Sequence, residues 1–344
     1  DVCSSDLRRS RPAGAHSRGR VNSQVPPATG RLQPAVSRLL IVRLGALGDI
    51  VHAVPVAAAL RQAYPDARID WVVEAPFAPL VRLHPAVDMA IPIAARAWRT
   101  AAFSTNTWSQ IASFKRALRT HRFDEVVDTQ GLFFKSALIA RYVHGRSHGY
   151  DAASIRERAA SWLYDVRHSV ERRQHAIARN RALTGKALGY TPEGPPDYGL
   201  DRAHLAGQSA AAPGAPYGVL LHASANRAKE WPDENWQALA KSLGSTFDLI
   251  VPYGSPTERE RAERIAQASP RARVPGYAPL DQLARTIAGA SFAVGVDTGL
   301  LHLAAALGVP LVAIFSASEP DLTGPMGAGP IEVDRKSTRL NSSH

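Results

Sequence analysis

The residues best suited to hold an anion lie in VGVDTGLLHLAAALGVP, where a predicted buried strand leads into a helix. Asp297, Thr298 and Gly299 fall at the start of that helix, so free backbone N–H groups and the positive end of the helix dipole favour a phosphate there. Thr298 adds a hydroxyl donor, Gly299 lets a ligand approach the backbone, and His302 follows one turn later. The structural alternative is that Asp297 only caps the helix, which contributes about 1 kcal/mol.

A second candidate group lies in the loop HASANRAKEWP, residues 222–232, after another predicted strand of the same half. Loops that follow parallel strands meet at one sheet edge, so Lys229 can reach a diphosphate held by the helix start. A lysine that is merely solvated is the alternative. Glu258 forms a capping box with Ser255 in SPTE, whether or not it also contacts a ligand.

Asp49 is the candidate for proton transfer. It ends the segment RLGALGD, between a predicted strand and a predicted helix. A carboxylate at that turn can take the proton of a substrate hydroxyl, which accelerates a reaction about 10²–10⁴-fold, or it can serve as a helix N-cap. The glycine spacing is not GxGxxG, so a nicotinamide dinucleotide is not expected.

Arginines accumulate in the first half, and guanidinium groups suit carboxylates and phosphates through paired hydrogen bonds. They are Arg96, Arg99, Arg156, Arg158, Arg167, Arg172 and Arg173. A solvated helix face explains some of them, Arg172 and Arg173 above all. The chain has no D-x-D string and no Cys or His cluster with metal-ligand spacing, so we expect no metal and no cofactor.

Composition limits the partners further. The 344 residues include 41 Lys and Arg against 30 Asp and Glu, a formal net charge of +11. Residues 1–37 contribute +4 and residues 333–344 contribute +2, which leaves +5 for the body, so we expect no nucleic acid as partner. Cys3 is the single cysteine and excludes an intrachain disulfide. Residues 292–315 are long enough to span a membrane, but Asp297 and internal glycines predict strand, turn, helix, turn and strand instead.

The elements that position these residues alternate between strand and helix. RLLIVRL, IVHAVPVAAALRQAY and IDWVVE predict a βαβ unit, and FDEVVDTQGLFFKSALIARYVH repeats the strand and the helix. The second half restarts with YGVLLHAS and continues the alternation. This pattern predicts an α/β protein with mainly parallel sheets. Residues 96–110, RAWRTAAFSTNTWSQ, lack clean periodicity, and we expect an excursion there at the mouth of the domain.

We expect two domains, 38–205 and 206–332, because the runs GYTPEGPPDYGL and GQSAAAPGAPYG are rich in Pro and Gly and mark a boundary. Residues 1–37 are expected to be a disordered tail. The extreme ends, DVCSSDL and RKSTRLNSSH, resemble translated adapter sequence. We therefore expect 1–37 and 333–344 to be non-native tails and the second domain to be truncated.

Four segments together resemble the lipopolysaccharide heptosyltransferases, glycosyltransferase family 9, most closely the heptosyltransferase I group. They are LIVRLGALGDIVHAVPVAAALRQAYPDARIDWVVE, DTQGLFFKSA, HASANRAKEWP and VDTGLLHLAAALGVP. The resemblance runs from about Arg38 to Glu332. It implies a GT-B type fold, two Rossmann-like domains facing across a cleft, with the acceptor on the first domain and the nucleotide sugar on the second.

The resemblance also implies a reaction and its participants. L-glycero-D-manno-heptose passes with inversion from ADP-L-glycero-D-manno-heptose to Kdo2-lipid A, at the cytoplasmic face of the inner membrane of a Gram-negative bacterium, with peripheral membrane contact. Asp49 is expected to be the base, and Arg96, Arg99 and Arg156 to meet the acceptor. Donor contacts are expected from Ser224, Ala225, Lys229, Glu258, Ala278, Asp297, Thr298, Gly299 and His302.

Three alternatives stay open at this point. Heptosyltransferase II, or another core-sugar transferase of the family, differs in its acceptor, so an acceptor swap separates it. The resemblance implies a final C-terminal helix that crosses back to the first domain, and the expected truncation would remove it. If that helix is needed to close the domains, the chain is an inactive nucleotide- or lipopolysaccharide-binding fragment, which would bind ADP without turnover. A Rossmann oxidoreductase would bind NAD.

Overall fold

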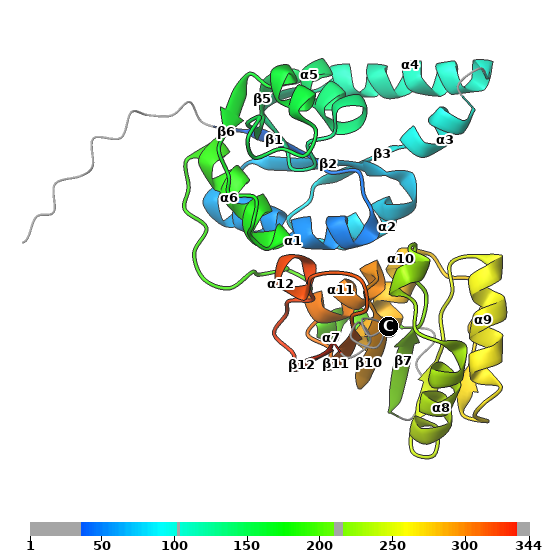
Figure 1. Ribbon diagram of the computed structural model, residues 1–344. Coiled ribbons are helices and arrows are strands. Elements are labelled where there is room, and N and C mark those ends of the chain that lie inside the picture. Colours follow the sequence, from blue (N-terminus) through cyan, green and yellow to red (C-terminus); the bar gives the residue numbers. More distant parts are fainter. Residues whose placement is uncertain (1–35, 102–103, 210–215, 336–344) are drawn as a thin grey trace, which may run out of the picture. The chain divides into compact units, whose positions relative to one another are not determined.

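The computed structural model describes residues 36–101, 104–209 and 216–335 (Figure 1). The tail predicted over 1–37 falls outside the described residues up to position 35, and Cys3 with it. Of the tail predicted over 333–344, residues 336–344 also fall outside. The described residues from Val36 onward form one compact unit.

The first half is built on a six-stranded sheet with the order β3-β2-β1-β4-β5-β6 and parallel neighbours throughout. Its central strand reads RLLIV, and residues 39–42 are buried, as expected of a parallel sheet covered on both faces. The strands are β1 (Arg38–Val42), β2 (Arg68–Glu74), β3 (Met89–Ile93), β4 (Arg122–Asp128), β5 (His144–Tyr150) and β6 (Val166–His168).

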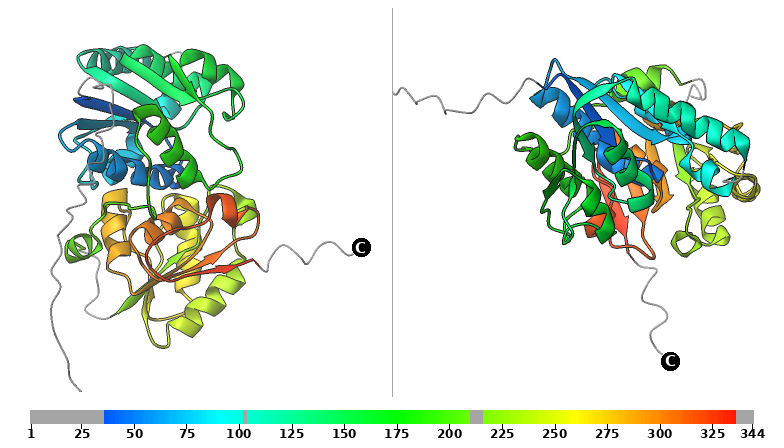
Figure 2. Two further views of the ribbon diagram at one scale, coloured as in Figure 1. Left: turned by 90° about the vertical axis from the view of Figure 1, so that its left-hand side faces the viewer. Right: turned by 90° about the horizontal axis from the view of Figure 1, so that it is seen from above.

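Helices connect these strands and cover the sheet (Figure 2). They are α1 (Leu47–Ala63), η1 (Ala75–Phe77), α2 (Ala78–Val81), α3 (Ala95–Thr100), α4 (Thr105–Arg119), η2 (Phe133–Ala137), α5 (Leu138–Tyr142), η3 (Arg158–Leu163) and α6 (Ala176–Leu188). The excursion predicted at 96–110 is largely helical, because residues 96–100 lie in α3 and residues 105–110 lie in α4. Helix α4 buries only Thr107 and Leu118. A helix with so few buried residues shows little of the apolar periodicity from which helices are predicted.

The second half repeats the design with the order β12-β11-β10-β7-β8-β9, again with parallel neighbours. Its strands are β7 (Tyr217–Leu221), β8 (Asp248–Ile250), β9 (Ala272–Arg273), β10 (Phe292–Val296), β11 (Leu311–Ile314) and β12 (Ile331–Asp334). Its helices are α7 (Arg202–Gly207), η4 (Arg227–Lys229), α8 (Asp233–Leu243), α9 (Pro256–Ala266), α10 (Leu280–Ala288), α11 (Gly299–Ala306) and α12 (Pro320–Thr323). The prediction of strand, helix and strand over 292–315 is confirmed by β10, α11 and β11.

Counted along the chain, each sheet has the strand order 3-2-1-4-5-6. Ligands of such sheets bind where the order reverses, outside the carboxyl ends of the first and fourth strands. In the first half these are β1 and β4, and in the second half β7 and β10. The predicted α/β class with parallel sheets is confirmed, and the topology itself points to two ligand-binding edges.

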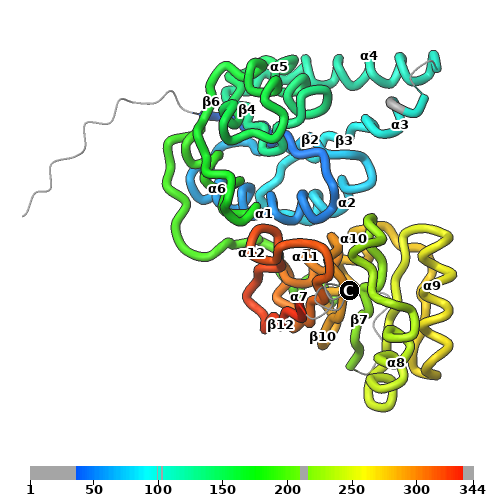
Figure 3. Tube along the Cα trace, viewed as in Figure 1, coloured from blue at the N-terminus to red at the C-terminus, as the bar shows by residue number. Residues whose placement is uncertain are grey.

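The largest hydrophobic cluster contains residues of both halves, from Leu39 in β1 to Leu301 in α11. Helices α1 and α11 pack against each other within it (Figure 3). The predicted boundary between 205 and 206 falls inside α7 and stays a prediction. Strand β12 reaches Asp334, two residues beyond the expected end of the second domain. Among the described helices, none combines the length and apolar character that crossing a bilayer requires.

Candidate active site

The turn that carries Asp49 follows the central strand β1. Gly45 has φ 147°, a conformation that L side chains rarely adopt, and the ring of Phe77 occupies the place of a side chain there. Helix α1 then begins at Leu47, with Ala46 as N-cap. Asp49 is therefore not the N-cap; it sits in the first turn, and its Oδ2 accepts a hydrogen bond of 3.2 Å from the Ala46 N–H.

A buried arginine holds the other oxygen of this carboxylate. Arg43 Nη2 lies 3.1 Å from Asp49 Oδ1, and Arg43 Nη1 donates to the carbonyl of Thr129 after β4. The Asp49 side chain is 46% exposed, whereas that of Arg43 is 9% exposed. A carboxylate accepts about four hydrogen bonds, so these two partners fix Asp49 and leave acceptor capacity for a substrate hydroxyl.

Asp49 and Arg156, both predicted from the sequence, line the same cavity of about 220 Å³. The cavity also contains Tyr150 and Arg179, which the sequence did not single out. The Arg179 guanidinium lies 4.9 Å from the centre of the Tyr150 ring, and its Nη2 donates to the carbonyl of Ser154 at 2.8 Å. With Arg43, three guanidinium groups surround one carboxylate, which suits an anionic ligand that also presents a hydroxyl.

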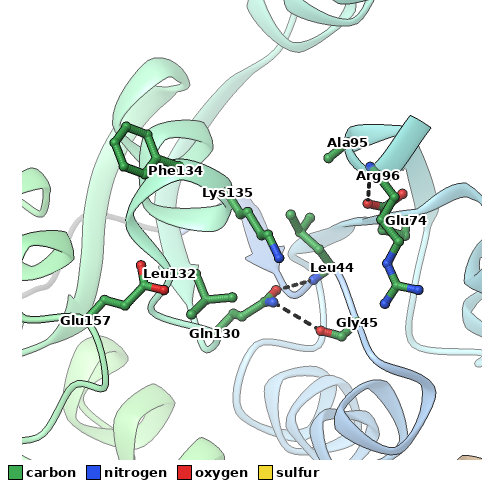
Figure 4. Close-up of a pocket in the computed structure, with 10 residues that line it drawn as sticks. All are labelled: Leu44, Gly45, Glu74, Ala95, Arg96, Gln130, Leu132, Phe134, Lys135 and Glu157. Atoms are coloured by element: carbon green, nitrogen blue, oxygen red, sulfur yellow. Dashed lines mark hydrogen bonds between the residues drawn. The ribbon is translucent and has the colours of Figure 1, made fainter. Parts of the chain in front are cut away.

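A larger neighbouring cavity, about 570 Å³, contains Arg96. Gln130 separates the two cavities: it accepts from the Leu44 N–H at 2.8 Å and donates to the Gly45 carbonyl at 3.1 Å. Figure 4 shows Lys135 reaching toward Gln130 from η2. Arg99 lies on α3 with its side chain outside the described part of the chain.

Glu74 gives this larger cavity a mixed charge. Its Oε1 accepts the Arg96 N–H at 3.0 Å. Burial raises the pKa of the Glu74 carboxyl, and the backbone and charge of Arg96 only partly oppose that effect. The cavity therefore contains two cations, Arg96 and Lys135, and two carboxyls, Glu74 and Glu157. Of the two carboxyls, Glu74 takes up a proton more readily than usual.

On the second sheet, the buried Asp297 gathers several of the predicted donor residues. Lys229 Nζ lies 2.6 Å from Oδ2, His302 Nε2 lies 3.2 Å from Oδ1, and the Ser318 hydroxyl donates to Oδ2. Burial alone would raise the pKa of Asp297, but the hydrogen bonds from His302, Lys229 and Ser318 outweigh it and lower the pKa well below its usual range. Asp297 thus bonds to side chains and does not cap α11.

The start of α11 uses one of its first-turn backbone donors internally, since the Leu301 N–H donates to the Thr298 carbonyl at 3.1 Å. In the described part of the chain, the side chain of the N-cap Thr298 takes none of the N–H groups of the first turn. The Ser224 hydroxyl donates to the Asp297 carbonyl at 3.1 Å, which draws the loop after β7 to the same place. A Cβ on Gly299 would lie 2.5 Å from the Leu47 Cβ, so the space at this glycine is filled by the first turn of α1.

The remaining predicted donor residues lie apart from this group. The Ser255 hydroxyl accepts the Glu258 N–H at 3.3 Å, which confirms one half of the capping box predicted from SPTE. The Glu258 carboxylate accepts the Gly254 N–H at 2.7 Å in place of the Ser255 N–H that a capping box requires. Glu258 lines a cavity of about 450 Å³ beside α8 and α9. Ala278 lines another cavity of about 480 Å³ next to α10, and Ala225 is exposed in the loop after β7.

Two histidines that the sequence analysis missed lie next to His302: His52 contacts it directly, and His175 contacts His52. The ring centre of His52 lies 4.5 Å from that of His302 and 5.5 Å from that of His175. His175 Nδ1 accepts the Ile177 N–H at 3.2 Å, so Nε2 carries the proton and donates to the Gly324 carbonyl at 3.0 Å. Burial, then His302 and His175, lower the pKa of His52 well below its usual range. The sequence signal that could have identified His52 is its position as a polar residue within the apolar run IVHAVPV.

Within the described ranges, no group of three or more His, Cys, Asp and Glu side chains is arranged to hold a metal ion.

Comparison with known proteins agrees with this geometry. The profile of glycosyltransferase family 9 (heptosyltransferase) matches residues 111–338. Lipopolysaccharide heptosyltransferase 1 of Salmonella typhimurium is 39% identical over 292 residues, which cover 84% of this chain and 92% of that protein. The structure of E. coli heptosyltransferase WaaC with ADP has a TM-score of 0.82 at 36% identity and covers 89% of this chain and 96% of the other.

A second structure, E. coli heptosyltransferase WaaC with ADP-2-deoxy-2-fluoro heptose, has a TM-score of 0.79 at 38% identity over 87% of this chain and 93% of the other. Similarity of this extent covers both sheets and both ligand-binding edges. The fold is of the GT-B type, and the chain is a glycosyltransferase that belongs to family 9, the heptosyltransferases.

Proposed function

We propose that this chain transfers L-glycero-D-manno-heptose from ADP-heptose to a Kdo sugar of Kdo2-lipid A, with inversion, and that Asp49 is the base. The observation that carries the proposal is the contact between two helix starts. Asp49 lies in the first turn of α1, and that turn packs on Gly299 in the first turn of α11. A carboxylate and an anion-binding helix start are thereby adjacent, as a sugar transfer from a nucleotide diphosphate requires.

In the proposed step, Asp49 takes the proton of the acceptor hydroxyl while the hydroxyl oxygen forms a bond to the anomeric carbon of heptose. The bond from that carbon to the β-phosphate oxygen breaks, and ADP leaves with the electron pair. Arg43 keeps the carboxylate in place, since it holds one oxygen at 3.1 Å. Attack from the face opposite the leaving group inverts the anomeric centre.

The charge that develops on ADP needs stabilisation at the start of α11. The free N–H groups of its first turn and the helix dipole supply part of it. Lys229 adds an ammonium group with three N–H donors, and in the described ranges one of them is used by Asp297, which leaves donors for the diphosphate. His302 and Ser224 hold this turn in place through Asp297.

The names of the similar proteins favour the type 1 acceptor over the heptosyltransferase II alternative. The Salmonella protein, named heptosyltransferase 1, is matched at 39% identity across most of both chains. The E. coli enzyme was solved with ADP and with an ADP-heptose analogue, which supports ADP-heptose as donor. Arg156 and Arg96, in the two cavities beside Asp49, are the proposed contacts to the acidic acceptor. Because Kdo2-lipid A is a lipid, we further propose peripheral contact with the cytoplasmic face of the inner membrane.

The test measures ADP release from ADP-heptose with and without Kdo2-lipid A, for the unchanged chain and for Asp49→Asn. Release that needs the acceptor and falls about 10²–10⁴-fold in Asp49→Asn supports both the transfer and the base. Asp66→Asn is the matched control, since Asp66 is an exposed aspartate in the turn after α1. A chain that binds ADP but does not release ADP from ADP-heptose would favour the inactive fragment. Preference for an already heptosylated acceptor would favour heptosyltransferase II.

A further inference from the structure

One surface of the first half exposes large apolar side chains among cations. We call it the aromatic-basic surface. Its apolar members are Trp108 (62% exposed), Phe134 (82%), Leu138 (43%) and Trp162 (72%). Its cations are the exposed side chains of Lys115, Arg119, Lys135, Arg141 and Arg158.

These residues lie on connected elements. Phe134, Leu138 and Tyr142 follow one another at four-residue spacing along η2 and α5, and η3, which carries Trp162, packs against both elements. From α4, Lys115 Nζ lies 5.1 Å and the Arg119 guanidinium 4.5 Å from the centre of the Tyr142 ring. Helices α4 and α5 run along the same edge of this half in Figure 1 and in the left panel of Figure 2.

Trp108 belongs to the same face of α4. It precedes Lys115 by seven residues and Arg119 by eleven, and residues at these spacings point to one side of an α-helix. The sequence of α4 has no Asp or Glu. Within the described ranges, none of the five cations of the aromatic-basic surface forms an ion pair with another side chain. The charges of Lys135 and Arg141 nevertheless act at longer range on the carboxyls of Glu74 and Asp165.

The aromatic-basic surface also touches the site. Phe134 and Lys135 line the larger cavity beside Asp49, and in Figure 4 the Phe134 ring lies at its outer end. The surface therefore extends outward from the place where the acceptor is proposed to bind.

We propose that the aromatic-basic surface docks on a lipid bilayer with acidic headgroups. Exposed aromatic side chains gain from burial at the boundary between headgroups and acyl chains, where the ring is buried and the indole N–H stays hydrated. Lys and Arg beside them are attracted to anionic lipids. This proposal rests on the proposed function in one respect, namely that the acceptor is a lipid. Docking beside the cavity would bring the sugar of a membrane-held acceptor to Asp49.

The test is co-sedimentation of the chain with vesicles that contain no acceptor: phosphatidylethanolamine with about a quarter phosphatidylglycerol, against phosphatidylcholine alone. The test variant is Trp108→Ser with Trp162→Ser, two residues outside the cavities. Tyr277→Ser, an aromatic 70% exposed in the second half, is the matched control. Lys115→Gln with Arg119→Gln tests the charge, against Lys241→Gln on α8.

We expect binding to the anionic vesicles, a loss of about tenfold for each tryptophan replaced, and release as salt rises from about 0.1 to about 1 M. Transfer to a water-soluble Kdo acceptor should persist in the tryptophan variant, which shows that it is folded. Equal vesicle binding by the test variant and the control would overturn the proposal, as would failure of the unchanged chain to bind the acceptor-free anionic vesicles. Absence of transfer to the soluble acceptor in the unchanged chain would instead count against the proposed function.

Discussion

Arg43 holds Asp49 from the buried side of the active-site turn, with Nη2 3.1 Å from Oδ1. Its second terminal nitrogen donates to the Thr129 carbonyl at the end of β4. The two strands at the reversal point of the first sheet are thus linked through one guanidinium to the proposed base. The orientation of Asp49 therefore depends on the contact of Arg43 with Thr129, a residue far away in the sequence but adjacent in the fold.

Replacing Arg43 should therefore lower turnover more than it weakens acceptor binding. We expect Arg43→Met to reduce kcat by about tenfold or more, because small misplacements of a reacting group are costly, and to change KM less. Steady-state kinetics with ADP-heptose and Kdo2-lipid A measure both constants. Arg82→Met, an exposed arginine after α2, is the control. A change in KM alone would show that Arg43 binds substrate and does not position the base.

Lys229 should affect the donor selectively. We expect Lys229→Gln to weaken ADP binding by about tenfold, since one charge-assisted contact to the diphosphate is lost. Titration calorimetry with ADP measures it, and Lys241→Gln serves again as the control. If Lys229→Gln bound ADP as tightly as the unchanged chain, the ion pair with Asp297 would be structural only.

Gly299→Ala should disturb the contact between α1 and α11. The added methyl would lie 2.5 Å from the Leu47 Cβ and 2.8 Å from the Gly48 nitrogen, which are both rigid atoms of the first turn of α1. We expect a loss of about 1–3 kcal/mol in the free energy of unfolding, measured with urea. At Gly207 a Cβ meets no described atom within 4 Å, so Gly207→Ala should leave stability unchanged or raise it. Equal effects of the two changes would contradict the packed interface.

His84 should make stability depend on pH. Burial lowers the pKa of His84 to about 4, against an ordinary value of 6.5 that holds in the unfolded chain. As the pH falls, the unfolded state binds the proton first, so the stabilisation from neutral His84 is complete above about pH 6.5 and is lost as the pH falls toward about 4.

The measurement compares urea unfolding of the unchanged chain and of His84→Gln at about pH 7 and about pH 5. The difference in unfolding free energy between the two proteins should change by about 2 kcal/mol in favour of the variant at the lower pH. His144→Gln, an exposed histidine at the start of β5, should show no such change. A constant difference across this range would mean that His84 titrates alike in both states.

The sequence predicted most of what positions the site. Apolar runs such as RLLIV and FAVGV identified the central strands, and the turns after them contain Asp49 and Asp297. Parallel topology then brings such turns to shared sheet edges, so the placement of both groups followed from local patterns and one general rule. Helices α3 and α4 escaped prediction because α4 has little contact with a core, and periodicity reports core contact.

The partners within the site could not be predicted in the same way. The contacts of Arg43 with Asp49, Ser318 with Asp297 and His52 with His302 depend on side-chain orientations at packed turns. From the sequence alone, a Lys229 side chain that pairs with Asp297 cannot be distinguished from one that is solvated. Such pairings depend on tertiary packing, and the spacing of residues along the chain does not predict them.

The shared strand order of the two sheets has an evolutionary consequence. Each half has its own reversal point, with its own pair of loops after the first and fourth strands. Under the proposed function, the acceptor binds beside the loops after β1 and β4 and the donor beside those after β7 and β10, so mutations in the first pair can change the acceptor while the second pair keeps the same donor. A lineage built on this duplicated plan can lengthen an oligosaccharide one sugar at a time by gene duplication, inheriting one half unchanged and revising the other.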